Sequence, residues 1–490
     1  MSNIRYESHY NFEAKKDAFP YQHEAFLAIK DKSYAAIFHE QGLGKTKIAI
    51  DLLLYWLTQR DIDAVLIVTK KTLVKNWEDE FATHTNLRPR TLDNRRGNNF
   101  YVFNSPARAI ITNFETISGE KERLKLYLKT RNVAIIIDES TKIKNPESKL
   151  TQDFFEIAPL FKIKIIMTGT PIANRPYDIW SQIYFLDEGE SLGKNFDSFK
   201  KQCDLSNDLY NNEERQRDFE DAVAAIYDKI RGFSVRETKS SGIITLPSKI
   251  YHDVFVGFEK EQLSMYEQVR KEMEILLRRG DKEILDESTD TIKRLLRLVQ
   301  ITSNPALIDD RYEGPSAKEI ILDKHIEQII NRDEKVIVWS IFTDNIDKFC
   351  KKYKNYHSVK ITGKMSVEER NRSVKSFKEG EACILFATPQ SAKEGLTLTV
   401  ANNAIFYDRG FNLDDYLQAQ DRIHRISQQK DCHIYNLMVE DSIDIWVDYL
   451  LKAKQQAAFL AQGDITKDMY KESANYDFAE IVRNILNTEI

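Results

Sequence analysis

Short runs of β-branched and apolar residues alternate with helix-period segments along most of the chain, and this alternation constrains the fold more than any other feature. In the first part of the chain the runs are Ala35–Phe38, Ala64–Thr69, Ala109–Thr112, Ala134–Asp138 and Lys164–Thr168. Helix-period segments such as Lys47–Thr58 and Lys75–Thr83 lie between them. Apolar strands that alternate with helices are typical of a parallel sheet with both faces covered.

The same alternation resumes in the second half, with the runs Lys335–Ser340, His357–Ile361, Ala382–Ala387, Asn403–Asp408 and Asp431–Leu437. Charged helical regions near residues 192–229 and 263–330 interrupt the pattern. We therefore predict an α/β fold of two parallel-sheet lobes with helical insertions. The first lobe is expected at residues 1–235, the second at 236–455, and a helical tail at 456–490.

Composition excludes several classes of protein. The chain has 490 residues, more than one ordinary domain of roughly 100–200 residues. Its 71 basic and 76 acidic residues give a net charge of −5, which argues against coating nucleic acid by bulk charge but allows a local basic groove. No apolar run approaches the ~18 residues of a membrane span, and the four cysteines lack metal-site spacing. We expect a soluble protein of a reducing, cytoplasmic compartment.

The segment after the first strand has the residues of a phosphate-binding loop. It reads His39-Glu-Gln-Gly-Leu-Gly-Lys45-Thr46. The glycines, here Gly42 and Gly44, let backbone N–H groups approach phosphate, the lysine holds terminal phosphates, and the threonine hydroxyl binds Mg²⁺. The strict pattern has glycine where this chain has His39, so an ordinary glycine-containing turn is the alternative.

Two adjacent acids, Asp138 and Glu139, end the apolar run Ile135–Ile137. At the tip of a strand both carboxylates can reach a nucleotide at the carboxyl edge of the sheet. Asp138 would hold Mg²⁺ through water, and Glu139 would polarise the attacking water. A solvated acidic turn is the alternative for a lone pair, but a phosphate loop upstream favours a nucleoside triphosphatase.

Two further segments are weaker signals. In the second lobe, Gln418-Ala-Gln-Asp-Arg422-Ile-His-Arg425 places two arginines on one face of a predicted helix, from which they could act as arginine fingers. A basic, solvated helix face is the alternative. Thr168 and Thr170, in Met167-Thr-Gly-Thr-Pro, could relay the nucleotide state from a strand end, although the segment is also good turn chemistry.

The order of these motifs resembles that of the Swi/Snf-type superfamily-two helicase-like ATPases. The resemblance is carried by Pro20-Tyr-Gln22, EQGLGKT, DESTKIKNP, MTGTPIANRPYDIWS, KVIVWSIFTDNIDKF, AKEGLTLTVANNAIFYDRGFN and QAQDRIHRISQQ. It extends from about Phe19 to Trp446 and includes Phe233-Ser-Val-Arg236, which is similar to the segment with which such proteins enter their second half. The resemblance implies two RecA-like lobes with helical insertions, ATP and Mg²⁺ as cofactors, and DNA as a partner.

The resemblance also implies a role for each matching residue. Gln22 would contact adenine, Lys45 and Thr46 would hold phosphate and Mg²⁺, and Asp138 and Glu139 would serve metal and water. Thr168 and Thr170 would couple the nucleotide to lobe movement. The second lobe would complete the site with Gly395, Gln418, Arg422 and Arg425. Contacts to the DNA backbone would come from Thr69, Lys70, Asn113, Ser340, Thr362 and Ser391.

Three positions depart from the family pattern. Thr141 stands where the family usually has His, Ser427 where it has Gly, and Thr397 where Asn is frequent. None removes a group needed for phosphate chemistry, so the departures concern how the nucleotide is coupled to lobe movement.

The leading hypothesis is an ATP-dependent motor that tracks along duplex or branched DNA through sequence-independent backbone contacts. The alternatives are a branch-migrating or fork-remodelling helicase of replication, recombination or repair, and a non-catalytic scaffold that binds DNA or protein. We expect a monomer in the cytoplasm of a bacterium or of a phage-infected host, and the sequence leaves its protein partners unknown.

Overall fold

The computed structural model describes residues 11–205, 209, 211–242, 246–278, 289–392, 396–474 and 476 of the chain. Contacts divide it into two compact units. The first comprises the described residues within Met1–Asp204, Asp221–Ile244 and Leu460–Ile465, and the second those within Leu205–Glu220, Thr245–Phe459 and Thr466–Ile490. Each unit is built on one parallel sheet with helices, which confirms the predicted fold class.

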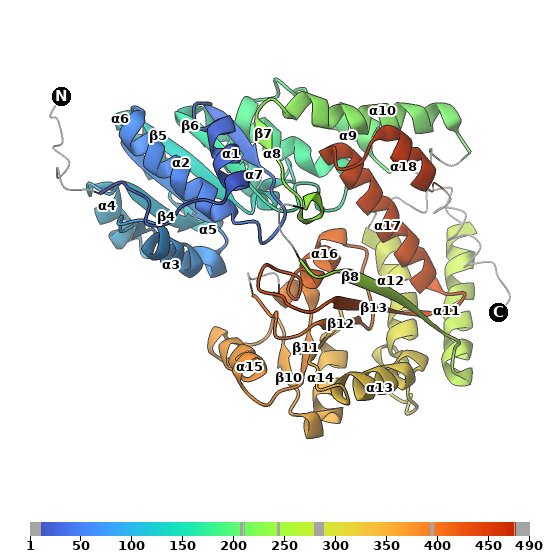
Figure 1. Ribbon diagram of the computed structural model, residues 1–490. Coiled ribbons are helices and arrows are strands. Elements are labelled where there is room, and N and C mark those ends of the chain that lie inside the picture. Colours follow the sequence, from blue (N-terminus) through green and yellow to red (C-terminus); the bar gives the residue numbers. More distant parts are fainter. Residues whose placement is uncertain are drawn as a thin grey trace. The chain divides into compact units, whose positions relative to one another are not determined.

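The first unit has a seven-stranded sheet in the order β3-β4-β2-β5-β6-β1-β7, with every neighbouring pair parallel. Figure 1 labels its strands β4, β5, β6 and β7. Its strands are β1 Tyr34–Ile37, β2 Ala64–Thr69, β3 Arg90–Thr91, β4 Ala109–Asn113, β5 Val133–Asp138, β6 Ile163–Met167 and β7 Ser234–Val235. Five of them match the predicted runs to within one residue at each end. The short edge strands β3 and β7 were not predicted.

Helices follow most of these strands. The helices assigned mainly to the first unit are α1 Pro20–Ile29, α2 Lys45–Gln59, α3 Val74–His84, α4 Arg96–Phe103, α5 Phe114–Gly119, α6 Lys121–Thr130, α7 Lys149–Ile157, α8 Trp180–Asp187, α9 Phe196–Cys203 and α10 Glu213–Ile230. The last two, α9 and α10, form the helical region predicted near residues 192–229. The predicted helices Lys47–Thr58 and Lys75–Thr83 correspond to α2 and α3.

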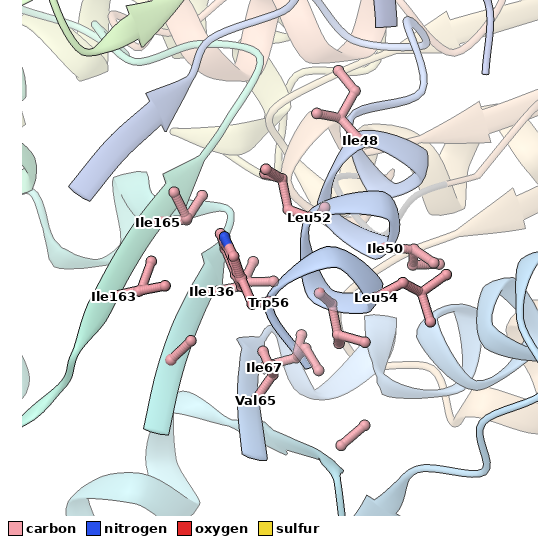
Figure 2. Close-up of a cluster of buried hydrophobic side chains, with 14 of the residues drawn as sticks. Ile48, Ile50, Leu52, Leu54, Trp56, Val65, Ile67, Ile136, Ile163 and Ile165 are labelled. Atoms are coloured by element: carbon pink, nitrogen blue, oxygen red, sulfur yellow. The ribbon is translucent and has the colours of Figure 1, made fainter. Parts of the chain in front are cut away.

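Helix α2 fixes the phosphate loop by its packing on the sheet. Ile48, Leu52 and Trp56 recur every four residues and are fully buried, and Figure 2 shows them in the cluster with sheet residues that include Ile136 and Ile165. Burial of each large apolar side chain is worth roughly 1.5–3 kcal/mol. The start of α2, where the loop meets the helix, is therefore held rigidly against the strands.

The second unit has a six-stranded sheet in the order β10-β11-β9-β12-β13-β8, again with every neighbouring pair parallel (Figure 1). Its strands are β8 Lys249–Val256, β9 Val336–Trp339, β10 Val359–Ile361, β11 Ile384–Ala387, β12 Asn403–Phe406 and β13 Cys432–Val439. The five predicted runs correspond to β9–β13. Strand β8 was missed because it lies at the sheet edge, where half-exposed His252 and exposed Asp253 interrupt the apolar run.

The helices assigned mainly to the second unit are α11 Lys260–Arg278, α12 Thr289–Ser303, α13 Ala317–Ile330, α14 Thr343–Lys352, α15 Val367–Glu379, α16 Leu413–Gln420, α17 Ile443–Gln462 and α18 Lys467–Ser473. The region predicted as a helical insertion near residues 263–330 contains α11, α12 and α13. Within the described residues, no helix has both the length and the apolar character needed to span a bilayer.

Candidate active site

The predicted residues of the first unit all lie at the carboxyl edge of its sheet. Thr69 ends β2, Asp138 ends β5, Thr168 follows β6, and the phosphate loop follows β1. Strand β6 pairs with both β5 and β1, and β5 also pairs with β2. Because parallel strands end at the same edge, the fold brings these distant segments side by side, at the place where open α/β sheets bind their ligands.

The phosphate loop has the backbone that its glycines predict. Gly42 and Gly44 have φ angles of 88° and 68°, in the left-handed region that glycine adopts without steric cost. Lys45 is the first residue of α2, and its Nζ donates to the carbonyl oxygens of His39 at 2.9 Å and Glu40 at 3.3 Å. The lysine thus spans the loop from a helix N-terminus, which is suited to hold an anion.

Gln22 packs directly against this loop. It is buried, and its Nε2 donates to the carbonyl oxygen of Leu43 at 3.3 Å. A Cβ atom added to Gly44 would lie 2.2 Å from Gln22 Nε2, so any larger residue here would displace Gln22, at a φ of 68° that already favours glycine. The structure therefore places Gln22 beside the predicted phosphate site, and its contact to adenine stays a prediction.

The threonine segment after β6 abuts the same loop. A Cβ atom on Gly169 would lie 2.6 Å from Gln41 Cγ and 3.3 Å from Lys45 Nζ. Thr168 is fully buried, and its Oγ1 accepts a hydrogen bond from the backbone N–H of Thr170 at 3.2 Å. The segment is thus a hydrogen-bonded turn that touches the phosphate loop, a position from which it can respond to nucleotide.

Asp138 is held by two donors. Its Oδ2 accepts hydrogen bonds from Thr69 Oγ1 at 3.0 Å and from the indole Nε1 of Trp77 at 2.9 Å. Burial raises the pKa of Asp138, the neighbouring charge of Glu139 raises it further, and the two donors act in the opposite direction. Both hydrogen bonds fall on the same oxygen, Oδ2.

These residues suit Mg²⁺. This ion usually keeps several waters and binds one or two carboxylates together with substrate phosphates. Asp138, at the end of β5, and Thr46, the second residue of α2, both offer oxygen atoms that could serve as ligands of this ion. Among the described residues no cluster of three or more His, Cys, Asp or Glu side chains could hold a metal ion.

Glu139 has an unusual backbone. Its φ of 57° lies in the left-handed region, which costs a residue other than glycine roughly 1–3 kcal/mol and often marks functional sites. Its Oε2 lies 3.3 Å from the Nζ of Lys70, the residue that follows β2. Two residues predicted to contact DNA, Thr69 and Lys70, therefore also contact the acid pair, Thr69 at Asp138 and Lys70 at Glu139.

Two contributors to this edge were not predicted. Trp77 is buried, as is Phe81, in the mostly charged and polar helix segment Val74–His84, and that contrast was the only signal for it. Asp464 pairs with Arg236 through Arg236 Nε at 2.6 Å, and Arg236 Nη1 donates to the carbonyl oxygen of Phe38 at 2.8 Å. The C-terminal residues 460–465 thereby support the end of β1, immediately before the phosphate loop.

His39, the residue that replaces the expected glycine, should make the stability of the folded chain depend on pH. Burial, together with the charges of Lys45 and Arg236, lowers the pKa of His39 to about 4. The folded chain therefore keeps the imidazole neutral at pH values where the unfolded chain, with a pKa near 6.5, binds a proton. This histidine should cost about 3 kcal/mol of stability as the pH falls from 6.5 to 4.

The measurement is the free energy of unfolding by denaturant between pH 7 and pH 4, for the unaltered chain and for His39→Gln. Asp138 titrates in both proteins, so the difference between them isolates His39. The unaltered chain should lose stability relative to the variant as the pH falls. A difference that does not change over this range would show that the imidazole is not held neutral.

In the second unit the arginines are not on a helix as predicted. Helix α16 ends at Gln420, and Arg422 and Arg425 lie in the turns that follow, so the expectation that they share one helix face was wrong. The reason is that each side chain takes a carbonyl that a continuing helix would need: Arg422 Nε donates to Gln418 O and Arg425 Nε to Asp421 O, both at 3.0 Å.

The remaining residues predicted in this part of the site have different surroundings. Gln418 is buried in α16, and its Nε2 donates to Asp414 Oδ1 at 2.7 Å. Arg425 Nη1 donates to Thr397 Oγ1 at 2.8 Å. Gly395 lies outside the described residues.

Most of the residues predicted to contact DNA make internal hydrogen bonds. Asn113 caps α5 by accepting from the N–H of Thr116 at 2.9 Å, and Ser391 Oγ donates to the carbonyl oxygen of Ile361 at 2.9 Å. Ser340 and Thr362 are buried at the ends of β9 and β10. These residues lie at or just after the carboxyl ends of their strands, and their contact to DNA stays a prediction.

Ser340 belongs to a buried network around Asp408, a residue not predicted to matter. Asp408 accepts hydrogen bonds from Ser340 Oγ at 2.6 Å, Ser303 Oγ at 2.7 Å and the N–H of Ile341 at 2.6 Å. Burial raises the pKa of Asp408. The network ties the end of α12 to the ends of β9 and β12.

Asp408→Asn should destabilise the second unit by about 2–3 kcal/mol, since an amide N–H₂ would replace an acceptor and face a donor. Thermal or denaturant unfolding measures the loss, and Asp310→Asn, an exposed aspartate of the same unit, is the control. Equal stability of the two variants would contradict the assigned role of the network.

Taken together, a glycine-rich loop at a helix N-terminus, an acid pair and a threonine turn on neighbouring parallel strands define a phosphate-loop nucleoside triphosphatase core. The chain also matches two family models, the SNF2-related domain over residues 25–307 and the helicase conserved C-terminal domain over residues 318–427. The chain therefore belongs to the SNF2-related family of helicase-like ATPases.

Similar proteins include the ISWI chromatin-remodeling complex ATPase ISW2 of Saccharomyces cerevisiae, 26% identical over 85% of this chain and 38% of that protein. The uncharacterized ATP-dependent helicase MG018 of Mycoplasma genitalium is 27% identical over 88% of this chain and 40% of that protein. The chain spans about two fifths of the length of these relatives. A solved structure, the Sulfolobus solfataricus SWI2/SNF2 ATPase core in complex with dsDNA, is 24% identical over 98% of both chains, with a TM-score of 0.43.

Proposed function

We propose that the chain is a DNA-dependent ATPase that hydrolyses ATP with Mg²⁺ at the carboxyl edge of the first sheet. The observation that carries this proposal is the adjacency of the phosphate loop, the threonine turn and the acid pair on β1, β6 and β5. Lys45 would hold the terminal phosphates, Thr46 and Asp138 would bind Mg²⁺, and Glu139 would orient the attacking water. Gln22, packed against Gly44, would contact the base.

The work done by hydrolysis would be movement along duplex or branched DNA. Membership of the SNF2-related family supports this, as do the contacts that Thr69 and Lys70, both predicted to bind DNA, make with the acid pair. Phosphates are the same at every sequence, so binding should depend strongly on salt and little on sequence. Gln418, Arg422 and Arg425 are proposed to act on the nucleotide from the second lobe during the cycle.

The remaining parts of the proposal concern organisation. We propose that the chain divides functionally near residues 235 and 455, with a helical tail at residues 456–490. A monomer in the cytoplasm is the proposed state, and protein partners are not assigned.

The proposal is tested by ATP hydrolysis with and without DNA. Duplex or branched DNA should raise the hydrolysis rate, and the half-saturating DNA concentration should rise steeply with salt. Displacement of a triplex-forming strand would show translocation on duplex DNA, whereas processing of a four-way junction without triplex displacement would show branch migration instead. Failure of every DNA to stimulate hydrolysis would refute the motor and favour a scaffold.

A further inference from the structure

The segment from Thr69 to Trp77, which we call the β2–α3 segment, contacts both members of the acid pair. Thr69 Oγ1 and Trp77 Nε1 donate to Asp138 Oδ2, at 3.0 and 2.9 Å. Lys70 Nζ lies 3.3 Å from Glu139 Oε2. One segment thus holds the predicted metal ligand with two neutral donors and holds the predicted water-orienting carboxylate with a cation.

These contacts differ in how easily they can be exchanged. Thr69 and Trp77 are buried, at 0% and 2% exposure, so their bonds to Asp138 belong to the core. The side chains of Lys70 and Glu139 are 23% and 16% exposed. The ion pair is therefore desolvated enough to hold the carboxylate, yet its ammonium is open to a competing anion.

An ion pair with Lys70 weakens Glu139 as the residue that orients water. The ammonium attracts the carboxylate and holds it beside Lys70. It also occupies an oxygen and fixes the side chain toward β2, and the left-handed backbone of Glu139 leaves few alternative conformations. Removal of the ammonium would free the carboxylate oxygen and let the side chain move.

We propose that Lys70 is a positioning residue that restrains Glu139 in the absence of DNA and releases it when a DNA phosphate takes the ammonium. The proposal rests on the proposed function and deepens it, because it names how DNA would regulate hydrolysis. Asp138 stays fixed by Thr69 and Trp77 in both states. DNA binding therefore changes the water-orienting carboxylate without disturbing the metal ligand.

The test compares three variants in ATP hydrolysis with no DNA and with saturating duplex DNA. Lys70→Ala should raise the rate without DNA roughly tenfold, and so shrink the stimulation by DNA. Lys70→Arg keeps the cation and should keep the rate without DNA low. Lys71→Ala removes the same charge at the exposed neighbouring residue, which contacts neither acid among the described residues, and should leave the rate without DNA unchanged.

The outcomes separate this inference from the function on which it rests. If the unaltered chain is stimulated by DNA but Lys70→Ala has an unchanged or lower rate without DNA, the restraint by Lys70 is refuted and the motor stands. If the unaltered chain is not stimulated at all, both are refuted. Thermal unfolding checks that the variants are folded, and Lys70→Met, which keeps the apolar stem, replaces the alanine variant if it is not.

Discussion

Lys45→Ala should abolish ATP hydrolysis, with turnover reduced by roughly 10³-fold or more. The ammonium bonds the carbonyl oxygens of His39 and Glu40 and sits at the N-terminus of α2, so it is in place to exchange these carbonyls for the terminal phosphates. Loss of a preorganised donor to developing phosphate charge costs roughly 10²–10³-fold, and loss of a full cation should cost more. Steady-state hydrolysis at saturating ATP and DNA measures the effect.

The control for Lys45→Ala is Lys129→Ala, which removes an exposed lysine at the end of α6. It should retain full turnover. ATP binding, followed with a fluorescent analogue, should weaken only in the Lys45 variant. Retention of near-normal turnover by a folded Lys45→Ala protein would mean that the phosphates bind elsewhere.

The sheet strands were predictable from the sequence where burial is complete. Runs such as Val133–Asp138, in which every residue is buried, can be read from apolar and β-branched residues alone. Strand β8 could not, because exposed and half-buried positions alternate along it and its polar residues hide the pattern. The edge strands β3 and β7 are two residues long, too short to show any period.

The candidate site was predictable to the extent that it consists of local motifs at strand ends. Once β1, β5 and β6 were recognised, parallel pairing required Lys45, Asp138 and Thr168 to share one edge. The sequence contains no comparable local signal for long-range partners. Trp77 reaches Asp138 from a helix that follows another strand, and Asp464 reaches Arg236 from the far end of the chain.

The end of α16 is another feature that could not be predicted from the sequence pattern. Helical periodicity places Arg422 and Arg425 on one face, but the pattern cannot reveal that the arginines themselves take the carbonyls at the helix end. Side chains that compete with backbone donors end a helix without any proline or glycine as a marker. The roles of these arginines therefore depend on a turn, whose geometry the sequence pattern did not predict.

Glu139→Gln should leave ATP binding intact and slow hydrolysis by roughly 10²–10⁴-fold, the usual contribution of a positioned acid or base. Glutamine keeps the length of the side chain and still offers an oxygen to Lys70, but it carries no charge with which to polarise water. The bonds of Asp138 to Thr69 and Trp77 should be unaffected, so Mg²⁺ and phosphate binding should persist. Single-turnover hydrolysis and ATP affinity, measured separately, distinguish a chemical defect from a binding defect.

Glu188→Gln is a matched control for this variant. Glu188 has the same φ of 57° and lies 3.8 Å from a lysine, Lys164, but it is exposed and far along the chain from the acid pair. The control therefore changes a glutamate with the same backbone conformation and removes an ion pair, but it lies outside the site. The Glu188→Gln protein should hydrolyse ATP normally. If Glu139→Gln turned over ATP within tenfold of the unaltered chain, water would be oriented by another group, and restraint of Glu139 by Lys70 could not regulate hydrolysis.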